Sequence, residues 1–241
     1  MIVKIAECYL DINNKYDYSN EFFAEYKVEE PARETVESIA VSEQEIDREQ
    51  EGYDQVFDRG YLETLAILRK IAEVFAQMDI ILMHGVAITY EDDCYIFTAR
   101  SGMGKSTHAF LWNKYLGGNV KIINGDKPFI KIKEKGLTVF GTPWCGKENI
   151  QINTSAQLKG IVFLERGNVP EISRLEPAMV TPRLLAQLHL TQSHPERTLK
   201  LCDYVVNNIP CYLLKCDISR ESVKVCFEKI TGKLMPEENL D

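Results

Sequence analysis

The chain has 241 residues and is 45% hydrophobic, enough to bury a core in one domain, or in one domain with a small accessory element. Its formal net charge of −8 and isoelectric point near 5.2 disfavour binding of nucleic acid through bulk positive charge. A negative surface also repels free nucleotides at long range, so any phosphate site must be built locally from backbone N–H groups and a few cations.

The sequence also bears on the compartment. No apolar run reaches the roughly 18–20 residues that a membrane span needs, and the N-terminus lacks the pattern of a signal peptide. The seven cysteines contain no C-x-x-C pair, so we expect reduced thiols rather than a zinc site or a disulfide framework. We therefore expect a cytoplasmic protein with neither a membrane nor a nucleic acid as partner.

The N-terminal part is predicted to be β-rich. Aromatic and β-branched residues between Asn-Asn and Glu-Pro breaks predict extended segments at 3–10, 21–28 and 35–41. Ser42 and Glu45 form a capping-box pattern that begins a short helix, and its charges on nearly all sides are typical of a solvated connector. We divide the chain into an N-terminal β-rich accessory element over 1–55 and a main domain over 56–241.

The main domain is predicted to alternate helices and strands. Apolar residues at helical spacing predict an amphipathic helix over 61–78. A strand over 80–90 and a second over 94–99 form a hairpin, followed by a helix over 106–115 that ends at Gly117-Gly118. Further elements are two or three strands within 121–143, a strand at 160–165, helices near 181–191 and 195–207, a strand at 211–216 and a helix at 219–231. Hairpins among helices favour an α/β fold with a mixed sheet rather than a doubly wound parallel one.

The strongest motif lies between the second strand of that hairpin and the helix after it. Its glycines let successive N–H groups point at phosphate oxygens, and the helix adds the partial positive charge of its N-terminus. Lys105 can reach the β- and γ-phosphates, and the Ser106 hydroxyl can bind Mg²⁺. Ala99 stands where the general pattern has glycine, which is a mild departure. We expect ATP to bind Ser101, Gly102, Met103, Gly104, Lys105, Ser106 and Thr107. The alternative is a glycine-rich turn capped by Ser106.

Two further residues are candidates for the chemistry. Asp126 follows an apolar strand, where its carboxylate can face Mg²⁺ or the attacking hydroxyl; an ordinary Asn-Gly-Asp turn is an equal alternative. His84 follows an apolar run, where a lone histidine is more often structural. The remaining histidines belong to no cluster and read as structural or exposed: His108, His189 and His194.

Three residues are candidates for the substrate side. The loop at 141–147 projects Trp144 and Lys147, which suit a phosphate or a substrate, although Trp144 is equally compatible with a buried loop anchor. Arg166 ends an apolar strand, where it can clamp a phosphate or cap a surface.

These motifs together resemble a known family. The order His84-Gly85-Val86, the loop at 101–106 and Asp126 is similar to the catalytic domain of HPr kinase/phosphorylase. The resemblance is closer to small bacterial HPr-kinase-like serine kinases, including lasso-peptide kinases, and runs from Tyr61 to Thr231. The shared patterns are YLE-x-LA-x-x-RKI, HG-x-AI, GKSTH, Asp-Lys-Pro, GTPW-x-GK and Phe-Leu-Glu-Arg.

The resemblance implies a fold like that of the HPr kinase and phosphoenolpyruvate carboxykinase group, with a phosphate loop in a mixed sheet. It implies that His84 lies near the phosphates, that Lys105 is the loop lysine and that Ser106 and Asp126 bind the metal. Asp126 matches the second residue of an Asp-Asp pair whose first residue is Gly125 here. One carboxylate then does the work of two, or Glu148 or Glu165 replaces the other. No basic C-terminal loop for phosphorolysis is evident.

The function expected from these residues is an ATP- and Mg²⁺-dependent kinase with Asp126, His84 and Lys105 as catalytic residues. Its expected acceptor is a hydroxyl, foremost a serine of a peptide or small protein, as in peptide modification. The alternatives are a nucleotide-binding regulatory module without phosphotransfer, and a small-molecule kinase or carboxykinase-like enzyme. The oligomeric state is left open, with a homo-oligomer among the alternatives.

Overall fold

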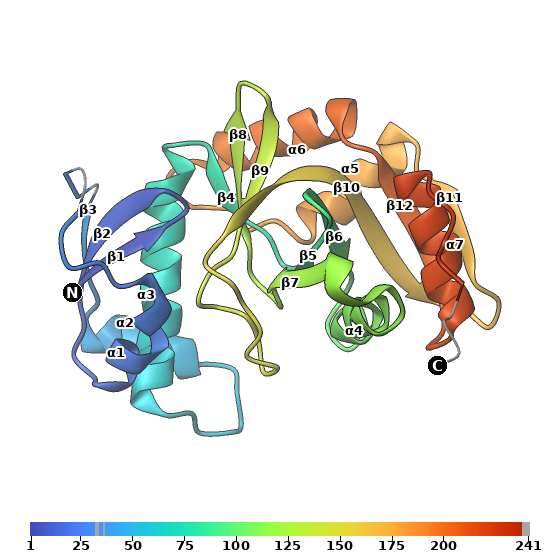
Figure 1. The fold of residues 1–241 in the computed structure, drawn as a ribbon. Helices are drawn as coiled ribbons and strands as arrows, with labels where there is room; N and C mark the ends of the chain where they lie inside the picture. Colours follow the sequence, from blue (N-terminus) through green and yellow to red (C-terminus); the bar gives the residue numbers. More distant parts are fainter. Residues whose placement is uncertain (32–33, 36, 238–241) are drawn as a thin grey trace.

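The computed structural model describes residues 1–31, 34–35 and 37–237 as a mixed α/β fold. Figure 1 shows a small N-terminal sheet with its helices at one end and a larger, curved sheet through the rest of the molecule. Within the described residues, the small sheet has three strands and the large sheet has nine. The large sheet contains parallel and antiparallel pairs, so the predicted mixed sheet is confirmed.

The small sheet consists of a hairpin and one further strand. β1 and β2 pair antiparallel, and β3 lies parallel to β2. Their bounds are β1 (Ile2–Ile5), β2 (Cys8–Asn13) and β3 (Glu37–Ala40). A turn at Ala6 and Glu7, both with positive φ, thus divides the predicted segment over 3–10. Residue 36 of the predicted segment over 35–41 lies outside the described residues.

The prediction of an extended segment over 21–28 is wrong. The chain there forms the end of helix α1 (Tyr18–Phe22) and the 3₁₀ helix η1 (Ala24–Tyr26). Phe23 and Tyr26 are both buried, and their spacing of three fits a helical turn rather than the alternation of a strand. Their packing into the N-terminal core outweighs the strand preference of aromatic residues.

The charged segment after Ser42 forms helix α2 (Glu43–Gln50), and the predicted capping box is present. The interpretation of this helix as a solvated connector is wrong, because Ile46 and Glu49 are buried. Glu49 Oε2 accepts a hydrogen bond of 2.9 Å from Arg69 Nη2 on helix α3 (Arg59–Ala76). The helix is therefore part of the packed N-terminal region.

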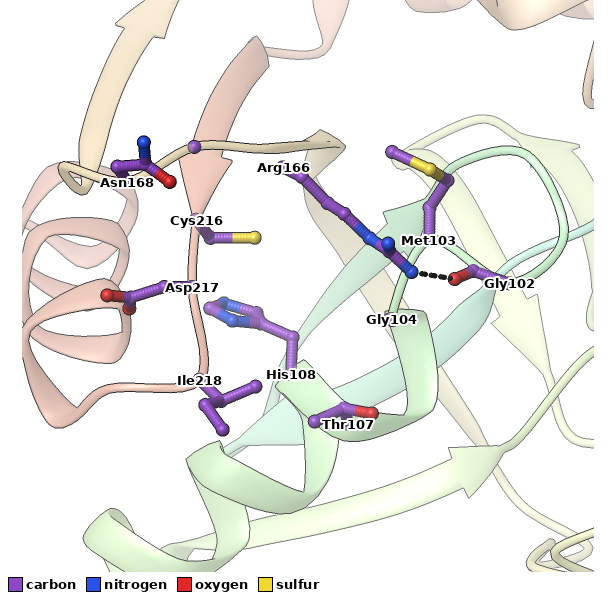
Figure 2. A pocket seen from close by; sticks show the side chains of 11 residues that line it. Gly102, Met103, Gly104, Thr107, His108, Arg166, Asn168, Cys216, Asp217 and Ile218 are labelled. Atoms are coloured by element: carbon purple, nitrogen blue, oxygen red, sulfur yellow. Dashed lines mark hydrogen bonds between the residues drawn. The ribbon is translucent and has the colours of Figure 1, made fainter.

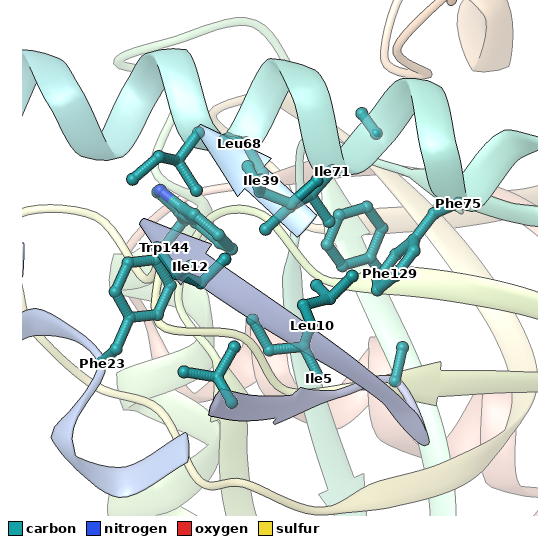
Figure 3. Packing of buried hydrophobic residues seen from close by; sticks show 14 of the residues in the cluster. Ile5, Leu10, Ile12, Phe23, Ile39, Leu68, Ile71, Phe75, Phe129 and Trp144 are labelled. Carbon is teal, nitrogen blue, oxygen red and sulfur yellow. The ribbon is translucent and has the colours of Figure 1, made fainter. Parts of the chain in front are cut away.

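One hydrophobic cluster joins the N-terminal element to the main sheet, as Figure 3 shows. The apolar face of α3 lies between the small sheet and side chains of the large sheet and its loops. The Phe75 and Phe129 rings meet edge to face with centroids 5.0 Å apart, and Phe23 contacts Trp144 at 5.5 Å. Residues from both sides of position 55 thus share a core, and the predicted boundary there stays a prediction.

The large sheet runs in the order β4-β8-β9-β10-β6-β5-β7, with β12 also pairing with β10 and β11 pairing with β12. The long strand β10 pairs antiparallel with β9 near its start and parallel with both β6 and β12. The bounds are β4 (Ile80–Leu82), β5 (Val86–Tyr90), β6 (Asp93–Thr98), β7 (Val120–Asn124), β8 (Phe129–Lys133), β9 (Gly136–Phe140), β10 (Ser155–Arg166), β11 (Glu171–Arg174) and β12 (Cys211–Cys216).

The predicted single strand over 80–90 is wrong, because its two halves lie near opposite ends of the sheet as β4 and β5. Residues 83–85 between them make long-range backbone bonds instead of continuing a ladder. The N–H of Met83 donates to Pro128 O at 3.1 Å, that of His84 to Gln187 O at 2.8 Å and that of Gly85 to Asp126 O at 2.8 Å. This crossing carries His84 to the region of Asp126.

Helices cover both faces of the large sheet. Successive residues of β10 alternate between two cores, with Ile161 and Phe163 packed toward α5 and α6, and Val162 and Leu164 toward α4 and α7. The bounds are α4 (Lys105–Leu116), η2 (Gly117–Asn119), α5 (Pro177–Leu185), α6 (Pro195–Asn208) and α7 (Arg220–Thr231).

Three smaller findings concern the bounds of α5 and β11, the state of the cysteines and the search for membrane-spanning helices. The helix predicted near 181–191 lies earlier in the chain, at Pro177–Leu185, so the prediction is wrong for residues 186–191; β11 was not predicted. All seven cysteines are buried free thiols. Of the helices in the described part of the chain, none combines the length and apolar character needed to cross a bilayer.

Candidate functional site

The glycine-bearing loop at 99–104 joins the end of β6 to the first turn of α4. Gly104 is the residue before the helix, with φ 99° and ψ 22°, a left-handed conformation that favours glycine. No side chain caps this helix, so its first N–H groups are left for another acceptor. A Cβ built on Gly102 or Gly104 would have no atom within 4 Å, so the loop borders open space.

Lys105 lies inside this loop rather than on the surface, with 8% of the residue exposed. Its ammonium donates a hydrogen bond of 3.4 Å to the carbonyl of Ala99. Burial lowers the pKa of Lys105, while the charges of Asp126 and Glu148 act in the opposite direction. A buried ammonium with one long hydrogen bond is available to an anion that enters the cavity beside it.

That cavity has a volume of about 540 Å³ and brings together residues that are far apart in the sequence. The loop at 99–104 and the start of α4 form one wall. The segments around Asp126 and Lys147 form the other. The cavity is lined by Tyr61, His84, Ser101, Gly102, Gly104, Lys105, Ser106, Thr107, Gly125, Asp126, Gly146, Lys147 and Glu148. Met103 lines two neighbouring cavities instead.

Asp126 is held in the cavity by the side chain of Asn124. Asn124 Oδ1 accepts hydrogen bonds from the N–H groups of Asp126, at 2.9 Å, and Lys127, at 2.7 Å. Asn124 Nδ2 donates at 3.0 Å to both the carbonyl and the hydroxyl of Thr142. The buried asparagine thus fixes the turn that presents Asp126, a function that sequence reasoning did not assign, although an Asn two residues before an Asp is a turn signal.

The carboxylate of Asp126 has two cationic or polar neighbours. Lys127 Nζ lies 2.5 Å from Oδ2, and His84 Nε2 lies 3.3 Å from Oδ1. Burial acts to raise the pKa of Asp126, but the hydrogen bond from His84 and the charge of Lys127 outweigh it and lower this pKa to about 2. Asp126 is therefore a carboxylate at neutral pH.

His84 is placed by its backbone rather than by a strand. Its carbonyl accepts a hydrogen bond of 2.7 Å from Thr98 Oγ1, at the end of β6. Its backbone N–H donates a hydrogen bond to the carbonyl of Gln187. These two anchors direct the imidazole toward Asp126 and into the same cavity as Lys105. The structure thus brings together the three residues predicted to be catalytic.

Gly125 stands where the resembled family has the first aspartate of its pair, and the backbone packs closely around it. A Cβ at this position would lie 2.4 Å from the carbonyl oxygen of Cys145, so no side chain fits without a backbone shift.

Of the two acids that could replace the missing aspartate, Glu148 lines the cavity. Glu165 does not belong to this cavity, and its Oε1 lies 3.6 Å from Arg183 Nη2. A Cβ on Gly146 would lie 3.1 Å from Asp126 Cβ and 3.6 Å from Glu148 Oε2, so the two acids flank this glycine.

Arg166 lines a different cavity, of about 570 Å³, shown in Figure 2. Its guanidinium donates a hydrogen bond of 3.0 Å to the carbonyl of Gly102, so it holds the loop at 99–104 from the end of β10. Gly102, Gly104 and Thr107 line both cavities, and the Arg166 cavity also has Asn168 and Asp217 in its wall. The structure therefore does not place Arg166 beside Lys147.

Trp144 is buried, with 4% exposed, and its indole N–H donates a hydrogen bond of 3.0 Å to the carbonyl of Thr64. Its ring packs against Phe22 and Phe23. It thus anchors the loop that carries Lys147, which itself lines the cavity of Asp126. Direct contact of Trp144 with an acceptor stays a prediction.

Behind the phosphate loop, His108 on α4 is buried and accepts a hydrogen bond of 3.1 Å from Trp112 Nε1 at its Nε2 atom. Burial lowers the pKa of His108 to about 3. This agrees with the expectation of a structural histidine.

The described residues of the cavity offer oxygen ligands to Mg²⁺ but no complete metal site. Within the described residues, no group of three or more His, Cys, Asp or Glu side chains is arranged to hold a metal by itself. Mg²⁺ is commonly held by only one or two carboxylates together with waters and substrate phosphates. The Ser106 hydroxyl and the carboxylates of Asp126 and Glu148 line one cavity and supply the oxygen atoms that this ion prefers.

Comparisons with known proteins add little to this geometry. No protein-family model matches the chain, and no curated protein matches it. Among solved structures, the chain is similar to the Hpr(Ser) kinase/phosphatase from Coxiella burnetii, with a TM-score of 0.38 and 10% sequence identity. The match covers 63% of this chain and 88% of that chain. A likeness at this level leaves the candidate site to be judged from its own residues.

Proposed function

We propose that this chain is an ATP- and Mg²⁺-dependent phosphotransferase that acts on a hydroxyl group. The observation that carries the proposal is the convergence of Lys105, Ser106 and Asp126 on one cavity beside an uncapped helix N-terminus. Free N–H groups and a buried ammonium suit a polyphosphate, and a nearby carboxylate suits a hydroxyl acceptor.

The nucleotide would lie across the phosphate loop. Gly102, Gly104 and Thr107 border both adjoining cavities, so a triphosphate on the loop can reach Lys105 at one end. Its nucleoside would then extend into the second cavity, beside Arg166 and Asp217. Arg166 would contribute by bracing the loop through Gly102 and by offsetting negative charge there.

Ser106 and Asp126 would hold Mg²⁺, with Glu148 as a further oxygen ligand. The metal would offset charge on the phosphates. Lys105 would act in the same way on the oxygens of the transferring group, and preorganised charges of this kind contribute most of the catalysis in such sites.

In the transfer step, the acceptor oxygen forms a bond to the γ-phosphorus. The bond between this phosphorus and the β–γ bridging oxygen breaks, and ADP leaves with the electron pair. The hydroxyl proton passes to a carboxylate oxygen of Asp126, which His84 orients, and is then released to solvent. A carboxylate with a pKa of about 2 is a weak base, so Asp126 would first position the hydroxyl and take its proton only late, as the bond to phosphorus forms, which a loose transition state allows. We infer a serine of a peptide or small protein as the acceptor, from the sequence resemblance.

The Lys105→Ala variant tests the proposal. It should lower kcat/KM for phosphotransfer about 10²- to 10³-fold, because deletion of one preorganised charge contact costs roughly 3–4 kcal/mol in the transition state. Calorimetric titration with ATP and Mg²⁺ should show binding to the wild type and weaker binding to the variant. Lys114→Ala, an exposed lysine on the same helix, is the matched control. Equal turnover in Lys105→Ala and Lys114→Ala would refute the assignment.

A second candidate is a regulatory module that binds nucleotide without transferring phosphate. The observation that favours it is Gly125, since the packed carbonyl of Cys145 leaves no room for a second aspartate. The presence of Glu148 in the cavity favours the enzyme instead. Tight ATP binding by the wild type, with no phosphate transferred to any acceptor of a serine peptide library, would decide for the module.

A further inference from the structure

A third cavity opens beside Asp126 and differs in character from the two around the phosphate loop. It has a volume of about 600 Å³, and its wall includes the rings of Tyr18, Phe22, Phe57 and Tyr61. We call these four residues and the space they border the aromatic groove. Its wall is mainly apolar, whereas the cavities beside the loop present backbone amides and charged groups.

The rings of the aromatic groove come from two helices and the segment before one of them. Tyr18 and Phe22 belong to α1, Tyr61 lies in the first turn of α3, and Phe57 precedes that helix. The Tyr18 ring stacks on Phe22 with centroids 6.2 Å apart and meets Tyr61 edge-on at 6.5 Å. Tyr18 is nevertheless 43% exposed. Partly exposed rings in one patch mark a surface that binds something apolar.

The aromatic groove is continuous with the candidate catalytic cavity. Tyr61, Asp126, Gly146 and Lys147 line both spaces. A group that enters the groove therefore lies next to the carboxylate proposed to position the acceptor hydroxyl. Of the four rings, only that of Tyr61 also lines the cavity of the loop at 99–104, so the occupant enters this cavity from the groove rather than across the loop.

We propose that the aromatic groove is the acceptor subsite and that it binds a large apolar or aromatic side chain adjoining the phosphorylated hydroxyl in a peptide. This rests on the proposed phosphotransferase function. Aromatic rings favour other rings in stacked or edge-on contact, and a cavity of this size takes one large side chain with its backbone. The N-terminal element thereby supplies one wall of the acceptor site, through Tyr18 and Phe22.

The test compares two serine peptides that differ only in the residue beside the serine, phenylalanine or alanine. The wild type should prefer the phenylalanine peptide about tenfold in kcat/KM, on the scale of aromatic contacts and the area they bury. Tyr18→Ala should remove most of this preference, and Tyr18→Phe should retain it. The readout is the ratio of the two kcat/KM values within each variant, so a general loss of activity cancels. Phe110→Ala is the matched control, since Phe110 is 39% exposed on α4 and lines none of the three cavities.

Analogues with alanine in place of serine give a second measurement that needs only the wild type. The phenylalanine analogue should inhibit transfer about tenfold better than its alanine counterpart. Equal use of the two peptides, or an equal loss for both in Tyr18→Ala, would overturn the inference. ATP binding and hydrolysis with no transfer to either peptide would overturn it too, while leaving the nucleotide site standing. Failure of the wild type to bind ATP would instead remove the proposed function itself.

Discussion

Two loops face each other across the candidate catalytic cavity, and they are built in opposite ways. The loop at 99–104 has few internal bonds, an uncapped helix behind it and glycines that border open space. The turn at 124–127 is held by Asn124, whose Oδ1 accepts hydrogen bonds from the N–H groups of Asp126 and Lys127 and whose Nδ2 donates to Thr142. The difference fits the proposed function. A loop proposed to bind phosphates keeps its donors free, whereas a turn that positions a carboxylate uses its donors on itself.

Among the changes that test this contrast, Asn124→Ala is expected to have the largest effect on the free energy of unfolding. The change leaves the N–H groups of Asp126 and Lys127 without their acceptor, at a cost of about 3 kcal/mol in the free energy of unfolding. Urea denaturation measures the loss. Phosphotransfer should fall with it, while the affinity of the folded protein for ATP without Mg²⁺ stays near that of the wild type, because the loop at 99–104 is untouched.

Asn208→Ala, at an exposed position on α6, is the control and should change stability by less than about 0.5 kcal/mol. If Asn124→Ala weakened ATP binding as much as phosphotransfer, the two loops would not be independent.

A smaller effect is expected from the pH dependence of the turn. The pKa of Asp126 is about 2 in the folded protein, below its ordinary value of 3.8. Its ionised form therefore contributes stability that is present above pH 3.8 and is lost as the pH falls toward 2, about 2 kcal/mol in total. Comparison of wild type and Asp126→Asn by urea denaturation should show a stability difference that shrinks across this window. A difference that stays constant with pH would contradict the ion pairing described.

The smallest effect on stability is expected from Gly104→Ala. The left-handed backbone at φ 99° costs a residue with a Cβ about 1 kcal/mol, although no neighbouring atom obstructs it. The binding free energy of ATP, measured by calorimetry, should weaken by more than this loss of stability, because the methyl group enters the space proposed to hold phosphate. Gly118→Ala has equal room and no positive φ, so it should change neither quantity. Unchanged affinity in Gly104→Ala would place the phosphates elsewhere.

The sequence predicted much of the fold where a pattern was long or sharply bounded. The helix over 61–78 and the hairpin before the phosphate loop were of this kind, because their periods extend over many residues. The break at Met83–Gly85 could not be seen, because an apolar run reads as one strand until its distant partners, such as Gln187, are known. The same holds for α1, where tertiary packing of Phe23 decides the conformation.

Those residues of the candidate site that belong to recognisable sequence motifs could be predicted. His84, Lys105 and Asp126 stand out by their neighbours, and the structure brings them into one cavity. Tyr61 could not be placed there from the sequence, because its helix spacing indicates only packing. The position of Arg166 in a separate cavity likewise depends on the pairing of β10 with β6, which no local pattern encodes.

The pair formed by His108 and Trp112 has a consequence for the helix that carries Lys105. An indole N–H can only donate, so the neutral imidazole must keep its proton on Nδ1. With a pKa of about 3, this ring takes up no proton at any pH above about 4. The charge of the interior beneath the loop therefore stays constant during mild acidification. Protonation of His108 would not change the proposed binding of an anion by the loop over that pH range.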